Sequence, residues 1–112
     1  MCIRDRFISG TASINNKGEV VHVGNIVKQA ERMWENVGVL LEEGGASFDD
    51  VMQIIVYLRD ICDYQTVKEM FDRRFPDIPK VITLAPVCRP TWLIEMECIA
   101  VKKRCNEKYR DF

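Results

Sequence analysis

Two carboxylates stand two residues apart in a hydrophobic segment near the C-terminal end of the sequence, at Glu95 and Glu97. Residues 93–101 alternate as a strand does, with apolar side chains at the even positions Ile94, Met96, Cys98 and Ala100. Because successive side chains of a strand point to opposite faces, both carboxylates lie on the same face. If the even positions pack under the helices, the carboxylates face away from the core.

A carboxylate in that place has a structural and a chemical interpretation. For Glu97, a salt bridge to an Arg or Lys of a neighbouring subunit and a place in a pocket stay equally open. Glu95 lies nearest to the "CRP" segment, residues 88–90, where the chain breaks and a pocket can form. A carboxyl group in such a pocket suits a general acid. We therefore predict that Glu95 is functional.

Composition excludes several classes of function. The chain of 112 residues has a formal net charge of -1 and no basic run, so we expect neither a nucleic-acid partner nor a second domain. No apolar run approaches the roughly 20 residues that cross a bilayer. The five cysteines include no CxxC pair, and His22 is the single histidine, so we expect no metal site. An odd number of cysteines fits the reducing cytoplasm.

The elements that must position Glu95 follow from periodicity. The spacing predicts a helix over 24–45, with one buried stripe formed by Ile26, Val27, Ala30, Met33, Trp34, Val37, Leu40 and Leu41. A second helix is predicted at 64–75, with Asp63 as its cap and Pro76 at its end.

Strands are predicted at 7–14, 19–23, 51–60, 80–87 and 93–101, the first two forming a hairpin. The strand at 51–60 is apolar enough to be buried on both faces. Gly10 within the first strand marks a bulge or a close approach of another backbone. These elements predict an α+β fold with both helices on one face of the sheet. Apolar residues on the other face require a cover, which is another copy or another domain.

Several segments together resemble the Rid superfamily, also called YjgF/YER057c/UK114. They are "FISGTASI", the helix 24–45, "IVYLRDICDYQTVKEMFDRRFP" and "IEMECIAV". The resemblance implies a chorismate-mutase-like α+β fold and a homotrimer whose sheets form a central barrel, with pockets between subunits. It places one domain at 7–102 and a C-terminal tail at 103–112. Residues 1–6 match nothing in the family, so we expect a non-native leader on a chain truncated at its start.

Many members of this superfamily are imine or enamine deaminases, which act on 2-aminoacrylate-type and 2-iminobutanoate-type intermediates. Their hallmark arginine, which holds the substrate carboxylate, falls on Val81 here, and their pocket cysteine falls on Thr83. Glu95 matches the glutamate that positions water. Valine cannot clamp a carboxylate, so this position departs from the deaminase pattern.

The segment "CRPTWLIE", residues 88–95, is similar to the C-terminal half of chorismatases, which hydrolyse chorismate and release pyruvate. That resemblance makes Glu95 the acid that protonates the enolpyruvyl methylene, with Cys88 lining the pocket. Thr83, at the position of the deaminase cysteine, is the further candidate for substrate binding. Cys88 is otherwise a small buried hydrophobe. Arg89 either contacts a carboxylate or braces the loop, and both interpretations stay open.

The first expectation is therefore a chorismatase-like hydrolase of a small carboxylate-bearing metabolite, without a cofactor. An imine deaminase and a non-catalytic trimer that binds a metabolite are the alternatives. The partner is a second and third copy of the chain, or a Rid-like domain.

Overall fold

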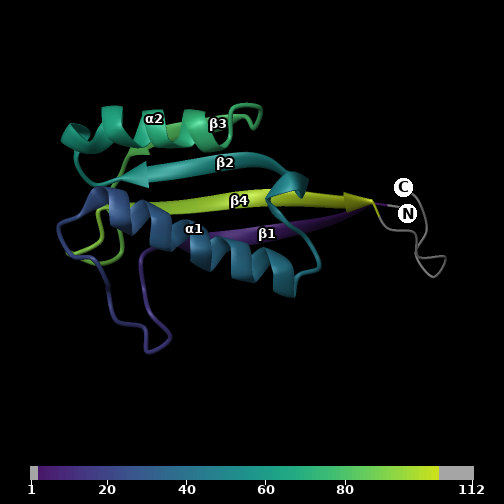
Figure 1. Cartoon of the computed structure of the whole chain (residues 1–112), viewed down its shortest axis with the longest axis horizontal. Helices are drawn as coiled ribbons and strands as arrows, with labels where there is room; N and C mark the ends of the chain where they lie inside the picture. Colours follow the sequence, from purple (N-terminus) through teal and green to yellow (C-terminus); the bar gives the residue numbers. More distant parts are fainter. Residues whose placement is uncertain (1–2, 104–112) are drawn as a thin grey trace.

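The computed structural model describes residues 3–103, which form one four-stranded sheet with two helices over one of its faces (Figure 1). The strands are β1 (Ile3–Thr11), β2 (Val51–Leu58), β3 (Lys80–Leu84) and β4 (Ile94–Lys103). The helices are α1 (Ile26–Glu43) and α2 (Tyr64–Arg74), with short 3-10 turns at Phe48–Asp50 and Ile61–Asp63. The strand order is β1-β4-β2-β3, in which only the β2–β3 pair is parallel. This is the α+β architecture with helices on one face that the sequence predicts.

The alternation in β4 sets the two faces of the sheet. Ile94, Met96, Cys98 and Ala100 are all buried and belong to the core under the helices. Glu95 and Glu97 therefore lie on the opposite face, which we call the outer face. The prediction made from the alternation is confirmed.

Helix α1 begins where the sequence indicates and buries a narrower stripe than predicted. The Asn25 side chain accepts a hydrogen bond from the backbone N–H of Lys28 and caps the helix. Val27 and Leu40 were wrongly assigned to the core, since they are 39% and 41% exposed on the flanks of the stripe. Gln29, a polar residue that a hydrophobic pattern cannot identify, is fully buried within the stripe.

Helix α2 packs beside α1 through aromatic rings. The Trp34 ring of α1 meets the rings of Phe71 and Phe75 edge-on, at centroid distances of 5.2 and 5.6 Å. Asp63 occupies the N-cap position but makes no side-chain capping bond. The capping carboxylate is instead Asp60, which accepts from the N–H of Cys62 and starts the preceding 3-10 turn.

Two predicted strands are corrected by the structure. Residues 19–23 form no regular strand. The predicted hairpin is reduced to one antiparallel bridge, between Ile14 and Val20, flanked by hydrogen bonds from the Asn15 N–H to the Glu19 carbonyl and from the Val21 N–H to the Ser13 carbonyl. The strand at 51–60 was predicted to be buried on both faces, yet in the single chain only its helix side is covered. Ile54 and Val56 are buried, whereas Gln53 is exposed and Ile55 is half-buried on the outer face. The hydrophobicity of this strand thus exceeds what one chain covers.

The ends of the described segment lie side by side. Strand β1 begins at Ile3, opposite Lys103 of β4, and the Arg6 Nε donates to the Gly44 carbonyl at 2.6 Å. The proposed non-native origin of residues 1–6 stays a prediction. Residues 104–112 of the predicted tail are outside the described residues. Neither α1 nor α2 is long and apolar enough to cross a membrane.

Candidate functional site

The outer face brings Glu95 and Thr83 into one row. Strand register pairs Tyr57 of β2 with Glu95 on one side and with Thr83 of β3 on the other. Paired residues of neighbouring strands share a face, so the row reads Thr83, Tyr57, Glu95. The adjacent row contains Val81, which is 59% exposed, and Glu97. Two of the predicted site residues therefore flank a tyrosine that the sequence analysis did not select.

Glu95 is a buried carboxylate that is held from two sides. Glu95 is only 8% exposed. Its Oε2 accepts a hydrogen bond from the backbone N–H of Cys88 at 3.3 Å. The Cys88 Sγ lies 3.8 Å from Oε1. On the other side, a Cβ on Gly10 would come within 2.8 Å of Oε1. The β1–β4 register shifts between Ile8 and Thr11, so Gly10 sits at the irregularity predicted for it.

The loop before β4 is fixed by Gln29 of α1. Its Nε2 donates to the carbonyl of Thr91 at 3.0 Å and its Oε1 accepts from the N–H of Leu93 at 2.9 Å. A longer bond of 3.3 Å reaches the carbonyl of His22. These bonds satisfy the backbone of the segment that enters β4 two residues before Glu95. The buried amide therefore positions the carboxylate indirectly.

Arg89 braces this loop and does not contact Glu95. One guanidinium nitrogen donates to the carbonyl of Gly18 at 2.6 Å. Its guanidinium carbon lies 5.2 Å from the centre of the Trp92 ring, a cation–π distance. Of the two interpretations left open for Arg89, these contacts match the bracing one.

Glu97 is paired within the chain by Tyr57. The Tyr57 hydroxyl donates to Glu97 Oε1 at 3.0 Å, and this bond raises the pKa of the phenol above its ordinary value. A hydrogen bond to a carboxylate favours the protonated phenol, which is the physical cause. The salt bridge to another subunit considered for Glu97 is not needed to satisfy this oxygen.

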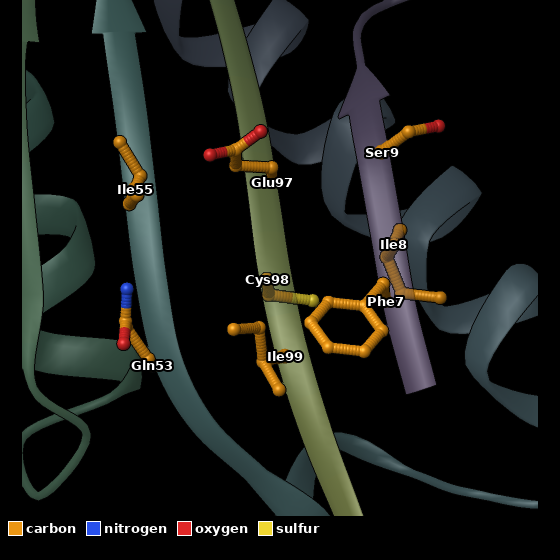
Figure 2. A pocket seen from close by; sticks show the side chains of 8 residues that line it. All are labelled: Phe7, Ile8, Ser9, Gln53, Ile55, Glu97, Cys98 and Ile99. Atoms are coloured by element: carbon orange, nitrogen blue, oxygen red, sulfur yellow. The ribbon is translucent and has the colours of Figure 1, made fainter. Parts of the chain in front are cut away.

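Two hollows border this region. The first, of about 290 Å³, lies on the outer face and is lined by Glu97, Gln53, Ile55 and Phe7 among others (Figure 2). The second, of about 520 Å³, lies between α1 and the end of β1 and includes Gly10 and Trp92. Glu95 lines neither of these two hollows.

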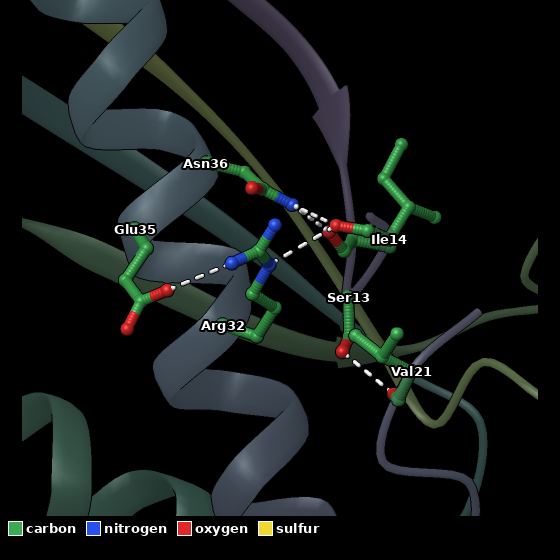
Figure 3. Close-up of polar contacts among 7 residues, drawn as sticks. Ser13, Ile14, Val21, Arg32, Glu35 and Asn36 are labelled. Atoms are coloured by element: carbon green, nitrogen blue, oxygen red, sulfur yellow. Dashed lines mark hydrogen bonds and ion pairs between the residues drawn. The ribbon is translucent and has the colours of Figure 1, made fainter. Parts of the chain in front are cut away.

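The wall of the second hollow is held by α1. Asn36 Nδ2 donates to the carbonyls of Ala12 and Ile14 at 2.9 and 3.1 Å, and Arg32 Nε donates to Ile14 at 3.1 Å (Figure 3). Arg32 also pairs with Glu35 on the same helix. The segment that follows β1 is thus tied to α1.

The chemistry available at this place is proton transfer. Glu95 contributes a carboxyl group from β4 on the outer face, and Thr83 and Tyr57 add hydroxyl groups along the same row. Across residues 3–103, no group of three or more His, Cys, Asp or Glu is arranged to hold a metal ion. The sequence pattern gave no signal for Tyr57, because its role depends on strand register.

Comparison with known proteins extends over most of the chain. Residues 4–102 match the family model described as Endoribonuclease L-PSP. A RutC family protein of Pyrococcus abyssi is 37% identical over 100 residues, covering 87% of this chain and 78% of that protein. The 3-aminoacrylate deaminase RutC of Acinetobacter baylyi is 27% identical over 96 residues, covering 84% and 76%.

Solved structures agree with this match. A crystal structure from Thermotoga maritima has a TM-score of 0.78 at 33% identity and covers 88% of this chain and 80% of its own. Yeast Mmf1, at 24% identity, has the same fold with a TM-score of 0.79. From its sequence motifs, its sheet order and these matches, the chain belongs to the endoribonuclease L-PSP family, the Rid/YjgF superfamily.

Proposed function

We propose that this protein hydrolyses a small metabolite with an electron-rich double bond, and that Glu95 supplies the proton. The observation that carries the proposal is the buried Glu95 carboxyl, fixed between the Cys88 N–H and Gly10 on the outer face. A carboxyl group that is held still and shielded from water is suited to deliver a proton to carbon.

Enamine hydrolysis is the reaction that best fits the family. Glu95 gives its proton to the β-carbon of the enamine, which leaves an iminium ion. Water adds to the iminium carbon, a proton returns to the Glu95 carboxylate, and ammonia departs to leave a carbonyl compound. The Acinetobacter relative named as a 3-aminoacrylate deaminase supports this class.

Hydrolysis of an enolpyruvyl ether, as in chorismatases, is the second candidate. It begins with the same proton transfer, to the methylene carbon of the enol ether, and ends with release of an alcohol and pyruvate. The contact between Cys88 and Glu95 favours it, because the "CRPTWLIE" resemblance puts that cysteine in the pocket. In both reactions Thr83 and Cys88 line the substrate pocket, and Arg89 braces the loop before β4.

We infer that the pocket is completed by neighbouring copies in a homotrimer. The support is the open outer face, where Phe7 is 73% and Val81 is 59% exposed and where a hollow of about 290 Å³ borders Glu97. Since Val81 cannot clamp a carboxylate, a substrate carboxylate takes its partner from the second copy or from the hydroxyl row. We propose a cytoplasmic location for this trimer, with the odd number of cysteines and the lack of a CxxC pair as the support.

The test compares the wild type with Glu95→Gln on two substrates. Ammonia is measured with an enamine generated in situ by a serine dehydratase, and pyruvate is measured with chorismate. Glu95→Gln keeps the size of the side chain but has no proton to give, so we expect turnover to fall about 10²-fold or more.

The outcomes separate the candidate functions. Equal turnover by wild type and variant would show that Glu95 is not the acid. Ligand-dependent thermal stabilisation without product, from either substrate, would identify a binding protein in place of an enzyme.

A further inference from the structure

Arg74, the last residue of α2, is held among three aromatic rings. Its guanidinium carbon lies 4.7 Å from the centre of the Trp34 ring, 5.1 Å from that of Phe48 and 5.3 Å from that of Phe75. The Phe48 and Phe75 rings are themselves 5.1 Å apart. Contacts with three rings restrict the guanidinium to one position at the end of the helix.

The hydrogen-bonding edge of this guanidinium is unused. Cation–π contact engages the charge and the flat faces of the group and leaves its in-plane N–H donors available. Arg6, Arg32 and Arg89 each donate to a backbone carbonyl. Within residues 3–103, by contrast, the structure shows neither a hydrogen bond nor an ion pair for Arg74. A positioned guanidinium with free donors is what a bidentate oxyanion requires.

Arg74 lines two hollows, and the charged residues in their walls differ. One, of about 250 Å³, lies between the helices and is lined by two arginines and one carboxylate: Val27, Glu31, Trp34, Met70, Arg73 and Arg74. The other, of about 410 Å³, contains the carboxylates of Asp49 and Asp77 and no second cation. The hollow between the helices is therefore the one that attracts an anion.

Trp34 forms part of the wall of the same hollow and is 5% exposed. Because the Arg74 guanidinium lies over its ring, the indole N–H of Trp34 is a reporter of any anion that binds Arg74. We propose that the hollow between α1 and α2 is a binding site for a phosphate-type oxyanion, held by the Arg74 fork with Arg73 as the second cation.

This site is separate from the proposed catalytic region. It lies on the helix side of the sheet, whereas Glu95 and Thr83 lie on the outer face. The inference therefore does not rest on the proposed hydrolysis, and either can fail alone.

The experiment is a titration of the ¹⁵N-labelled full chain with inorganic phosphate, followed through the indole N–H resonances. The sequence contains two tryptophans, so Trp34 reports on the hollow and Trp92 serves as an internal control. Sodium chloride at equal ionic strength is the matched titration. We expect a saturable shift of Trp34 with a Kd on the order of 1 mM, with Trp92 unmoved.

Four variants sharpen the test. Arg74→Gln and, more mildly, Arg73→Gln weaken phosphate binding, the first about tenfold or more, because charge-assisted bonds are lost. Glu31→Gln removes the one carboxylate of the hollow and tightens binding. Arg59→Gln, at an exposed arginine outside the hollow, leaves phosphate binding unchanged.

The proposal is overturned if phosphate and chloride shift Trp34 alike, or if Arg73→Gln and Glu31→Gln leave the curve unchanged. These two exposed positions decide the matter even if Arg74→Gln unfolds the protein.

Discussion

Gly10 has no side chain where the Glu95 carboxylate approaches strand β1 most closely. A Cβ there would lie 2.8 Å from Oε1, so Gly10→Ala forces the buried carboxylate to move by several tenths of an ångström. Misplacement of a catalytic group by about 1 Å costs about 10²-fold in rate. We expect turnover to fall about tenfold or more while the melting temperature changes little, as measured by steady-state kinetics and calorimetry.

Lys17→Ala, at an exposed position of the turn that follows the same strand and outside the sheet face proposed to assemble, is the control for Gly10→Ala and should keep full activity. Unchanged turnover in Gly10→Ala would mean that the carboxylate position in this structure is not the working one.

Cys98 gives a prediction about pH. Burial raises the pKa of its thiol from 9.0 to about 11, which lowers the thiolate fraction at pH 8 about a hundredfold. We expect iodoacetamide at pH 8 to label Cys98 at least about a hundred times more slowly in the native protein than in urea, by peptide mass spectrometry. Comparable rates in the two states would contradict the buried position.

The same rise in the pKa of Cys98 makes the stability of the fold depend on pH. The folded state favours the protonated thiol. The contribution of Cys98 to the free energy of unfolding is therefore fully present below pH 9 and is lost as pH rises towards 11.

Glu95 shows what a sequence can and cannot predict at this scale. Strict alternation placed its side chain opposite the core, and the glycine in the first strand indicated a close approach. The partner of Glu97 could not be predicted, since Tyr57 reaches it only through the register of β2 against β4. The direction of the Arg89 side chain depends on the distant Gly18 carbonyl, which no local pattern contains.

At the scale of elements, Gln29 joins α1 to the loop before β4. Gln29→Leu keeps the volume but removes the side-chain partners of the Thr91 carbonyl and the Leu93 N–H, which are part-buried bonds. A hydrogen bond contributes about 0.5–1.5 kcal/mol, so we expect the free energy of unfolding to fall by about 2 kcal/mol in urea titration.

Gln65→Leu is the matched substitution for Gln29→Leu, because Gln65 bonds only to Glu69 on the exposed side of α2. It should change stability by less than about 0.5 kcal/mol. Equal effects of the two substitutions would show that the bonds from Gln29 to the loop before β4 do not stabilise the fold.

Element types were predictable where periodicity was strong, as in α1 and β4. The failures have physical causes. Residues 19–23 are β-prone, but their pairing with residues 13–15 is limited to one bridge and two flanking backbone bonds. Asn15 accepts from the N–H groups of Lys17 and Glu19 and closes the turn between them. The buried Gln29 was missed because a polar residue in an apolar stripe is recognised only by the backbone groups that it satisfies.

At the scale of the whole molecule, the outer face is the surface through which we propose that copies assemble. Ile55 lies on this face in the apolar strand β2, and we propose that neighbouring copies cover it. Ile55→Glu should convert a particle of three 13.0 kDa chains into monomers, as measured by light scattering after gel filtration.

Val39→Glu, at an exposed position of α1, is the control for Ile55→Glu and should leave the assembly intact. A wild-type protein that runs as a monomer at all concentrations would refute the trimer.

The pairing of β1 with β4 has a consequence for how the chain folds. Strand β1 has its only described sheet neighbour in β4, and Ile3 pairs with Lys103 about a hundred residues later. Closing so large a loop costs entropy before any contact is gained, and long-range pairing of this kind slows folding. During synthesis, strand β1 emerges first and waits for the last strand of the sheet. The sheet is therefore completed only when nearly the whole described chain has left the ribosome.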